Sequence, residues 1–91
     1  MNIARANQVL YLINEAVSEV ESQAERLALL LAECRRERYW EVRGFKREYQ
    51  WIEATFPDKS LRYIRELSKL GQAYENESGI ISDIGPAKAG L

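Results

Sequence analysis

The chain has 91 residues, of which 46% are hydrophobic and 30% are charged, with a net charge of −1. This composition is too apolar for a disordered chain, and the length allows one domain with a modest core, so a second copy of the chain is an expected partner. One cysteine and no histidine exclude an internal disulfide and a Cys/His metal site.

The apolar runs are too short to cross a membrane. The longest, "LALLLA" at residues 27–32, falls far short of the ~20 residues that a bilayer requires. No charged segment followed by an apolar one opens the chain, as a secretory signal would. The sequence therefore predicts a cytoplasmic protein without a membrane partner.

The first 34 residues carry an unbroken heptad pattern. Apolar residues are separated alternately by three and four positions, which is typical of a coiled-coil seam. The members of the seam are Ile3, Ala6, Leu10, Ile13, Val17, Val20, Ala24, Leu27, Leu31 and Cys34. Neither proline nor glycine occurs before Gly44, so residues 1–43 are predicted to form one long oligomerisation helix, about 60 Å in length.

Oligomerisation is expected to depend on the larger seam residues. These are Leu10, Ile13, Val17, Val20, Leu27 and Leu31. Further apolar residues flank the seam, so a helical bundle, an antiparallel pair and a parallel dimer all remain open. Cys34 occupies a seam position, where it is either a small core residue or the site of a regulatory disulfide between chains.

Residues 44–91 are predicted to form a compact helical module. Eight of the nine aromatic residues lie between 39 and 74, as a small core requires. A helix is expected at about 45–54, with Phe45, Tyr49 and Ile52 on its apolar face. "TFPD" forms the turn, because Pro57 prevents its predecessor from continuing a helix and Asp58 is a suitable N-cap. A further helix is expected at about 59–74, ending before Gly79.

Positive charge is concentrated in the middle of the chain. Residues 35–70 contain ten Lys and Arg against six Asp and Glu, whereas residues 1–34 have a net charge of −3 and residues 71–91 a net charge of −2. Such a concentration is necessary for binding phosphate, although a mixed solvated surface gives the same count.

The helix predicted at 59–74 follows a short helix and a tight turn along the chain, and its outer face is basic. This is the layout by which a recognition helix enters the major groove. Arg62 and Arg65 suit guanine edges, whereas Lys59 and Lys69 suit phosphates. Any amphipathic helix also has a charged outer face, and Glu66 within this one would repel phosphate.

The last residues, "SDIGPAKAGL", suggest a tight turn at Gly85 and a helix beginning at Pro86. Backbone N–H groups at such a turn hold a phosphate, with Lys88 nearby. The alternative is a plain capping turn that docks the neighbouring isoleucines on the core.

The segments "GF", "YQWIEATFPDKSLRYIRELSKL" and "IISDIGPAKAGL" resemble a pattern in small plasmid, phage and bacterial helix-turn-helix proteins, and distantly that of ParB-type partition proteins. The resemblance covers residues 44–91. It implies DNA binding, with Ser60, Leu61, Arg62, Tyr63 and Arg65 at the start of the recognition helix. "DIGPAKAGL" is similar to the helix-hairpin-helix phosphate turn, with Asp83 where the first glycine is usual.

No catalytic motif, no phosphate-cradling glycine loop and no carboxylate cluster for a metal is evident, so neither enzymatic activity nor a cofactor is expected. The sequence predicts an all-α protein with a long N-terminal coiled-coil-type helix (residues 1–43) and a compact helix-turn-helix-like module (residues 44–91). Its predicted function is a DNA-binding regulator or accessory factor of a mobile genetic element, acting on double-stranded DNA as a homodimer or higher oligomer. A protein-protein interaction adaptor without nucleic-acid binding, and a structural bundle subunit, are the alternatives.

Overall fold

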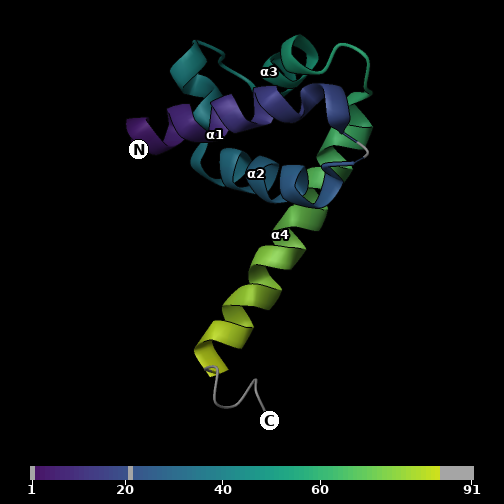
Figure 1. The fold of residues 1–91 in the computed structure, drawn as a ribbon. Helices are drawn as coiled ribbons and strands as arrows, with labels where there is room; N and C mark the ends of the chain where they lie inside the picture. The colour runs from purple at the N-terminus through teal and green to yellow at the C-terminus, as the bar shows by residue number, and fades with distance from the viewer. Residues whose placement is uncertain (1, 21, 85–91) are drawn as a thin grey trace.

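The chain is helical throughout the part that the structure describes. The computed structural model describes residues 2–20 and 22–84, with side chains up to Asn76. The elements in chain order are α1 (Ile3–Ala16), the 3-10 turn η1 (Val17–Glu19), α2 (Ala24–Glu37), the 3-10 turn η2 (Tyr39–Arg43), α3 (Glu48–Thr55) and α4 (Leu61–Ile84). Figure 1 shows α1 between α3 and α2, with α4 crossing α2 and then leaving the globule. The all-α fold class is confirmed.

The first 43 residues do not form the single long helix that the sequence predicts. α1 ends at Ala16 and α2 begins at Ala24, and the two helices pack side by side in opposite directions (Figure 1). The residues between the two helices include Val17, Ser18 and Val20. Valine loses more side-chain freedom in a helix than an unbranched residue does, and the serine hydroxyl competes for the hydrogen bonds of the helix backbone. The break lets the apolar stripe of α1 pack on α2 of the same chain.

The predicted oligomerisation residues consequently lie in the core of one chain. Leu10, Ile13, Val20, Leu27 and Leu31 are buried, and Val17 is partly buried against the same cluster. This core also contains residues after position 44, such as Ile52 and Ile64. Because the chain covers these side chains itself, association through them would require the α1–α2 hairpin to open. Homo-oligomerisation as such stays a prediction.

α2 ends at Glu37 and not at Gly44. Arg38 adopts the left-handed backbone conformation, with φ 59° and ψ 45°, and its N–H donates to the carbonyl of Cys34. The chain then forms η2, which places Tyr39 and Trp40 in the core, and Gly44 ends this turn with φ 84°. Gly44, which the sequence predicts as the end of the long helix, therefore ends η2. The C-cap of α2 is Arg38, which is not a glycine.

A polar cluster joins α1 to α2 and η2. The guanidinium of Arg5 donates two hydrogen bonds to the carboxylate of Glu33, both at 2.7 Å, and the hydroxyl of Tyr39 donates a third at 2.8 Å. The bond from Arg5, ahead of that from Tyr39, holds the pKa of Glu33 below its usual value. Burial and the nearby Glu33 raise the pKa of Tyr39 to about 12. Glu33 therefore stays charged and Tyr39 stays neutral at pH 7.

Both helices that the sequence predicts after Gly44 are present, but they begin and end at other residues than predicted. α3 begins at Glu48 rather than near Phe45, and it buries Trp51 and Ile52 while Tyr49 remains 41% exposed. Pro57 lies in the turn as predicted, but Ser60 and not Asp58 caps α4. α4 continues to Ile84, so the predicted end before Gly79 is wrong.

α4 packs mainly on α2, through small residues. The buried small side chains and backbone at this crossing belong to Ala28, Ala32, Ser68 and Gly71. Small residues let the two helix backbones approach closely. Beyond the crossing, the last turns of α4 extend away from the other described helices (Figure 1).

Candidate nucleic-acid interface

The start of α4 is fixed against α3 by an aromatic turn. Five residues, 56–60, join Thr55 to Leu61. Phe56 packs edge-on against Trp51, with ring centres 6.2 Å apart and an interplanar angle of 89°. The N–H of Lys59 donates to the carbonyl of Phe56 at 3.1 Å. The turn therefore sets the orientation of α4 by core packing as well as by hydrogen bonding.

Ser60 caps α4 rather than standing free. Its hydroxyl oxygen accepts the backbone N–H of Tyr63 at 3.0 Å, which satisfies one of the unpaired donors of the first turn. An accepting hydroxyl keeps its own O–H available, and the side chain is exposed. Ser60 thus positions the helix and presents one donor toward solvent.

Lys59 and Arg62 are the cations of the predicted basic face that lie away from described carboxylates. The ammonium of Lys59 lies 5.8 Å from the ring centre of Tyr63, and Arg62 is exposed. Among the described residues, no carboxylate oxygen lies within 4.0 Å of either cation. Both charges are therefore available to an anionic partner.

Arg65 and Lys69 are partly neutralised. The Nε of Arg65 lies 3.6 Å from Glu48, whose other carboxylate oxygen lies 3.4 Å from Arg35. Glu48 is 13% exposed, so it stands as one carboxylate between two guanidinium groups. Lys69 lies 3.8 Å from Glu66 in an exposed pair of little energetic weight. Of the two arginines predicted to read bases, Arg62 is the one without a carboxylate partner in the described part of the chain.

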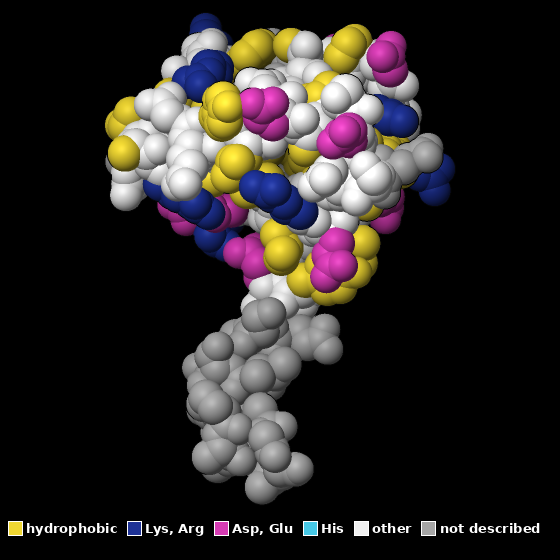
Figure 2. Space-filling view, viewed as in Figure 1, with side chains coloured by type: hydrophobic (Ala, Val, Ile, Leu, Met, Phe, Trp, Pro, Cys, Tyr) yellow, Lys and Arg dark blue, Asp and Glu magenta, His cyan; other side chains and the backbone are white. Residues whose placement is uncertain are grey.

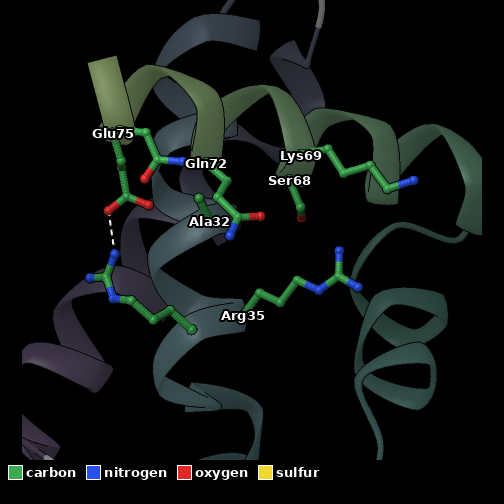
Figure 3. Close-up of a pocket in the computed structure, with 8 residues that line it drawn as sticks. Ala32, Arg35, Ser68, Lys69, Gln72 and Glu75 are labelled. Carbon is green, nitrogen blue, oxygen red and sulfur yellow. Dashed lines mark hydrogen bonds and ion pairs between the residues drawn. The ribbon is translucent and has the colours of Figure 1, made fainter. Parts of the chain in front are cut away.

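A groove between α2 and α4 holds basic residues to which the sequence assigned no role. It encloses about 470 Å³, and its walls are formed by Ala32, Arg35, Arg36, Ser68, Lys69, Gln72, Glu75 and Asn76. Figure 3 shows Arg35 on α2 and Lys69 on α4 at the walls of this groove, and Arg36 pairs with Glu75 across it. Arg35 and Arg36 belong to the run "CRRER", which we included in the long helix because neither proline nor glycine precedes Gly44.

The face of the molecule that Figure 2 presents does not carry a large patch of charge of one sign. Lys and Arg are intermixed there with Asp, Glu and apolar side chains. The start of α4 offers phosphate a local basic face made of Lys59 and Arg62.

Two predicted phosphate-binding elements, Lys88 and the turn at Gly85, lie outside the residues that the structure describes. Among the side chains that the structure describes, which end at Asn76, no three His, Cys, Asp or Glu are grouped so that they could hold a metal ion. In the same part of the chain, no helix combines the length and hydropathy needed to span a bilayer.

Comparison with protein-family models, with curated proteins and with solved structures finds no match for this chain.

Proposed function

We propose that the chain binds double-stranded DNA through α3, the turn at 56–60 and the start of α4, with α4 as the recognition helix. The observation that carries this proposal is the pairing of a capped, exposed helix start with the half-buried Lys59 and the exposed Arg62, neither of which has a carboxylate partner among the described residues. The helix-turn-helix arrangement supplies a rigid platform that directs such a start into the major groove.

The side chains suggest a division of roles. Arg62 offers the planar donor pair that matches the N7 and O6 acceptors of guanine. Lys59, Lys69 and the exposed O–H of Ser60 are suited to phosphate oxygens, which position a protein without reading sequence. Arg65 reaches DNA only after leaving Glu48, which makes it a weaker contributor. The resemblance of residues 44–91 to small plasmid and phage proteins favours a regulator or accessory factor of a mobile element.

Because the net charge of the chain is −1, we expect binding through a few local phosphate contacts, which make the affinity sensitive to salt. Three or four phosphate contacts give a slope of about −3 in a plot of log K against log salt. Affinity would then fall on the order of 100-fold between 50 and 200 mM salt.

Selection of duplexes from a random-sequence pool, followed by fluorescence anisotropy at these two salt concentrations, tests the proposal. Wild-type protein is expected to enrich a sequence motif and to lose affinity as salt rises. Arg26→Ala, an exposed arginine on α2, is the control and is expected to bind like the wild type. A helical circular dichroism spectrum together with no binding to any duplex at 50 mM salt would exclude DNA binding.

A protein-binding adaptor is the second candidate, because large apolar side chains stand exposed beside the basic face. Tyr63 and Leu70 keep 37% and 43% of their surface accessible. An adaptor predicts no salt-dependent DNA affinity at all. In that case a protein partner would be lost on Tyr63→Ala or Leu70→Ala, while Arg62→Ala would have a smaller effect.

A further inference from the structure

α4 carries an apolar stripe that the other described residues leave partly uncovered. The members of this α4 stripe are Tyr63, Leu67, Leu70 and Tyr74. Tyr63 and Leu70 are exposed, Tyr74 is half-buried, and Leu67 forms the floor of a shallow groove of about 400 Å³. Leu67 is itself buried and belongs to the core cluster, so the stripe borders the side of α4 on which Ile64, Ser68 and Gly71 are buried.

The spacing within the stripe is that of a coiled-coil seam. Its members are four, three and four residues apart, and the sequence continues this register through Glu77 to Ile81 and Ile84. α4 is a helix over this whole range, and its last turns extend beyond the globule without another described helix beside them (Figure 1). α4 therefore carries one long seam register, and no other helix in the described part of the chain lies beside its last turns.

Charge along α4 is divided into two halves of opposite sign. Residues 59–70 contain four Lys and Arg and one Glu, whereas residues 71–84 contain three acidic residues and no cation. Two parallel copies would bring like charges together. Two antiparallel copies would bring the basic half of each helix beside the acidic half of the other, which is the favourable arrangement.

We propose that the α4 stripe binds the α4 helix of a second copy of this chain in antiparallel orientation. The register that places Leu70 opposite Tyr74 of the second copy centres the pair near Gln72. In this register, the groove over Leu67 receives the acidic half of the other helix. This contact differs from the N-terminal seam, whose side chains already lie in the core of one chain.

The proposed contact borders the basic face of α4. Arg62 precedes Tyr63 by one position, which places it about 100° around the helix from that stripe residue. Lys69 lines the groove over Leu67, and the ammonium of Lys59 lies 5.8 Å from the ring centre of Tyr63. Self-association is measured without DNA, so its test does not depend on the proposed function.

Sedimentation equilibrium of the full chain tests the contact. Wild-type protein is expected to be dimeric at tens of micromolar, and Leu70→Lys is expected to raise the dimer dissociation constant at least tenfold with an unchanged circular dichroism spectrum. Ile3→Lys is the matched control, because Ile3 is an exposed aliphatic residue on α1, and it should leave the constant unchanged. A monomeric wild type, or a dimer that Leu70→Lys does not weaken, would overturn the proposal.

Spin-label distances test the orientation. In a Cys34→Ala background, labels are introduced by Arg62→Cys or by Ala73→Cys. Antiparallel pairing separates the two labels at position 62 by about 30 Å along the helix axis, while the labels at position 73 lie close together. Short distances for both variants would indicate parallel pairing and would contradict the proposed register.

Discussion

Gly71 of α4 lies directly against the backbone of Ala28 of α2. A Cβ atom placed on Gly71 would stand 1.9 Å from the carbonyl oxygen of Ala28 and 2.3 Å from its carbonyl carbon. Both atoms belong to the backbone of a buried helix, so neither can move aside without displacing α2. Glycine is therefore required here by the distance between two helices, although within an isolated helix it is less favourable than alanine.

Gly71→Ala is expected to destabilise the protein by about 2 to 4 kcal/mol, since overpacking forces the helices apart. Helix propensity alone predicts the opposite sign, a gain of about 1 kcal/mol. Urea unfolding followed by circular dichroism measures the difference. Gln72→Ala, one residue further and exposed, is the control and should change stability by less than about 0.5 kcal/mol. A Gly71→Ala variant as stable as the wild type would show that the helices are not this close.

Glu33 is expected to make the stability of the fold depend on acid. Its pKa is lowered in the folded chain, first by the hydrogen bond from Arg5, so its contribution is present above the ordinary value of 4.5 and is lost as the pH falls through the folded pKa. Glu33→Gln should cost about 1 to 2 kcal/mol at pH 7, because it weakens charge-assisted bonds in a partly exposed cluster. The difference between the two proteins should shrink as the pH is lowered below 4.5.

Thermal unfolding at pH 3, 5 and 7 measures this effect. Glu37→Gln serves as the control, because Glu37 lies nearby on α2 and is more exposed than Glu33. An equal loss for both variants at every pH would contradict a specific role of the cluster.

Cys34 is expected to be inert in the folded chain. Its side chain is fully buried, and burial, followed by the nearby charge of Glu48, raises its pKa to about 12. Because the thiolate is the reactive species, a thiol reagent such as Ellman's reagent should label the native protein slowly at pH 8 and label it at once in 6 M guanidinium chloride. Rapid labelling without denaturant would instead favour the alternative of an accessible, regulatory cysteine.

The two arginines near the start of α4 should differ in their effect on DNA binding. If Arg62 contacts a base edge, Arg62→Ala should weaken the selected site by about 1 to 3 kcal/mol. Arg65→Ala should weaken it less, because Arg65 is already engaged by Glu48 at 3.6 Å. Titrations of the selected duplex and of an unrelated duplex at 100 mM salt measure both losses. A larger effect of Arg65→Ala would mean that its ion pair with Glu48 opens in the complex.

Lys59→Ala should behave differently from both arginines. As a phosphate contact, Lys59 should contribute equally to all sequences, and its removal should reduce the salt slope by about one. A change of sequence preference on Lys59→Ala would assign it to a base edge instead.

Arg38 offers a test of backbone strain. A left-handed conformation with φ 59° costs a non-glycine residue about 1 kcal/mol, and glycine adopts it freely. Arg38→Gly is therefore expected to raise the free energy of unfolding by up to about 1 kcal/mol, even though it removes the exposed ion pair with Glu41, because such a pair contributes little. Glu41→Gln removes the ion pair alone and measures it separately in the same urea unfolding experiment. A destabilised Arg38→Gly variant would show that the arginine side chain contributes more than its pairing suggests.

The sequence by itself determined the helical class and most of the core. The spacing identifies Leu10 and Ile13 on the apolar face of α1 and Leu27 and Leu31 on that of α2, and all four are buried. Pro57 likewise marks the turn before α4, because its ring constrains the backbone of its own residue and of its predecessor. Such local constraints act whatever the rest of the chain does.

Only the tertiary structure decided what the apolar stripe packs against. A heptad pattern is satisfied equally by a second chain or by a neighbouring helix of the same chain, and the break after Ala16 selects the neighbour. The pairing of Arg65 with Glu48 and the contact of Gly71 with Ala28 join residues 17 and 43 positions apart. Neither of these two contacts produces a periodic pattern in the sequence, because each depends on how closely two helices approach and not on which residues share the face of a single helix.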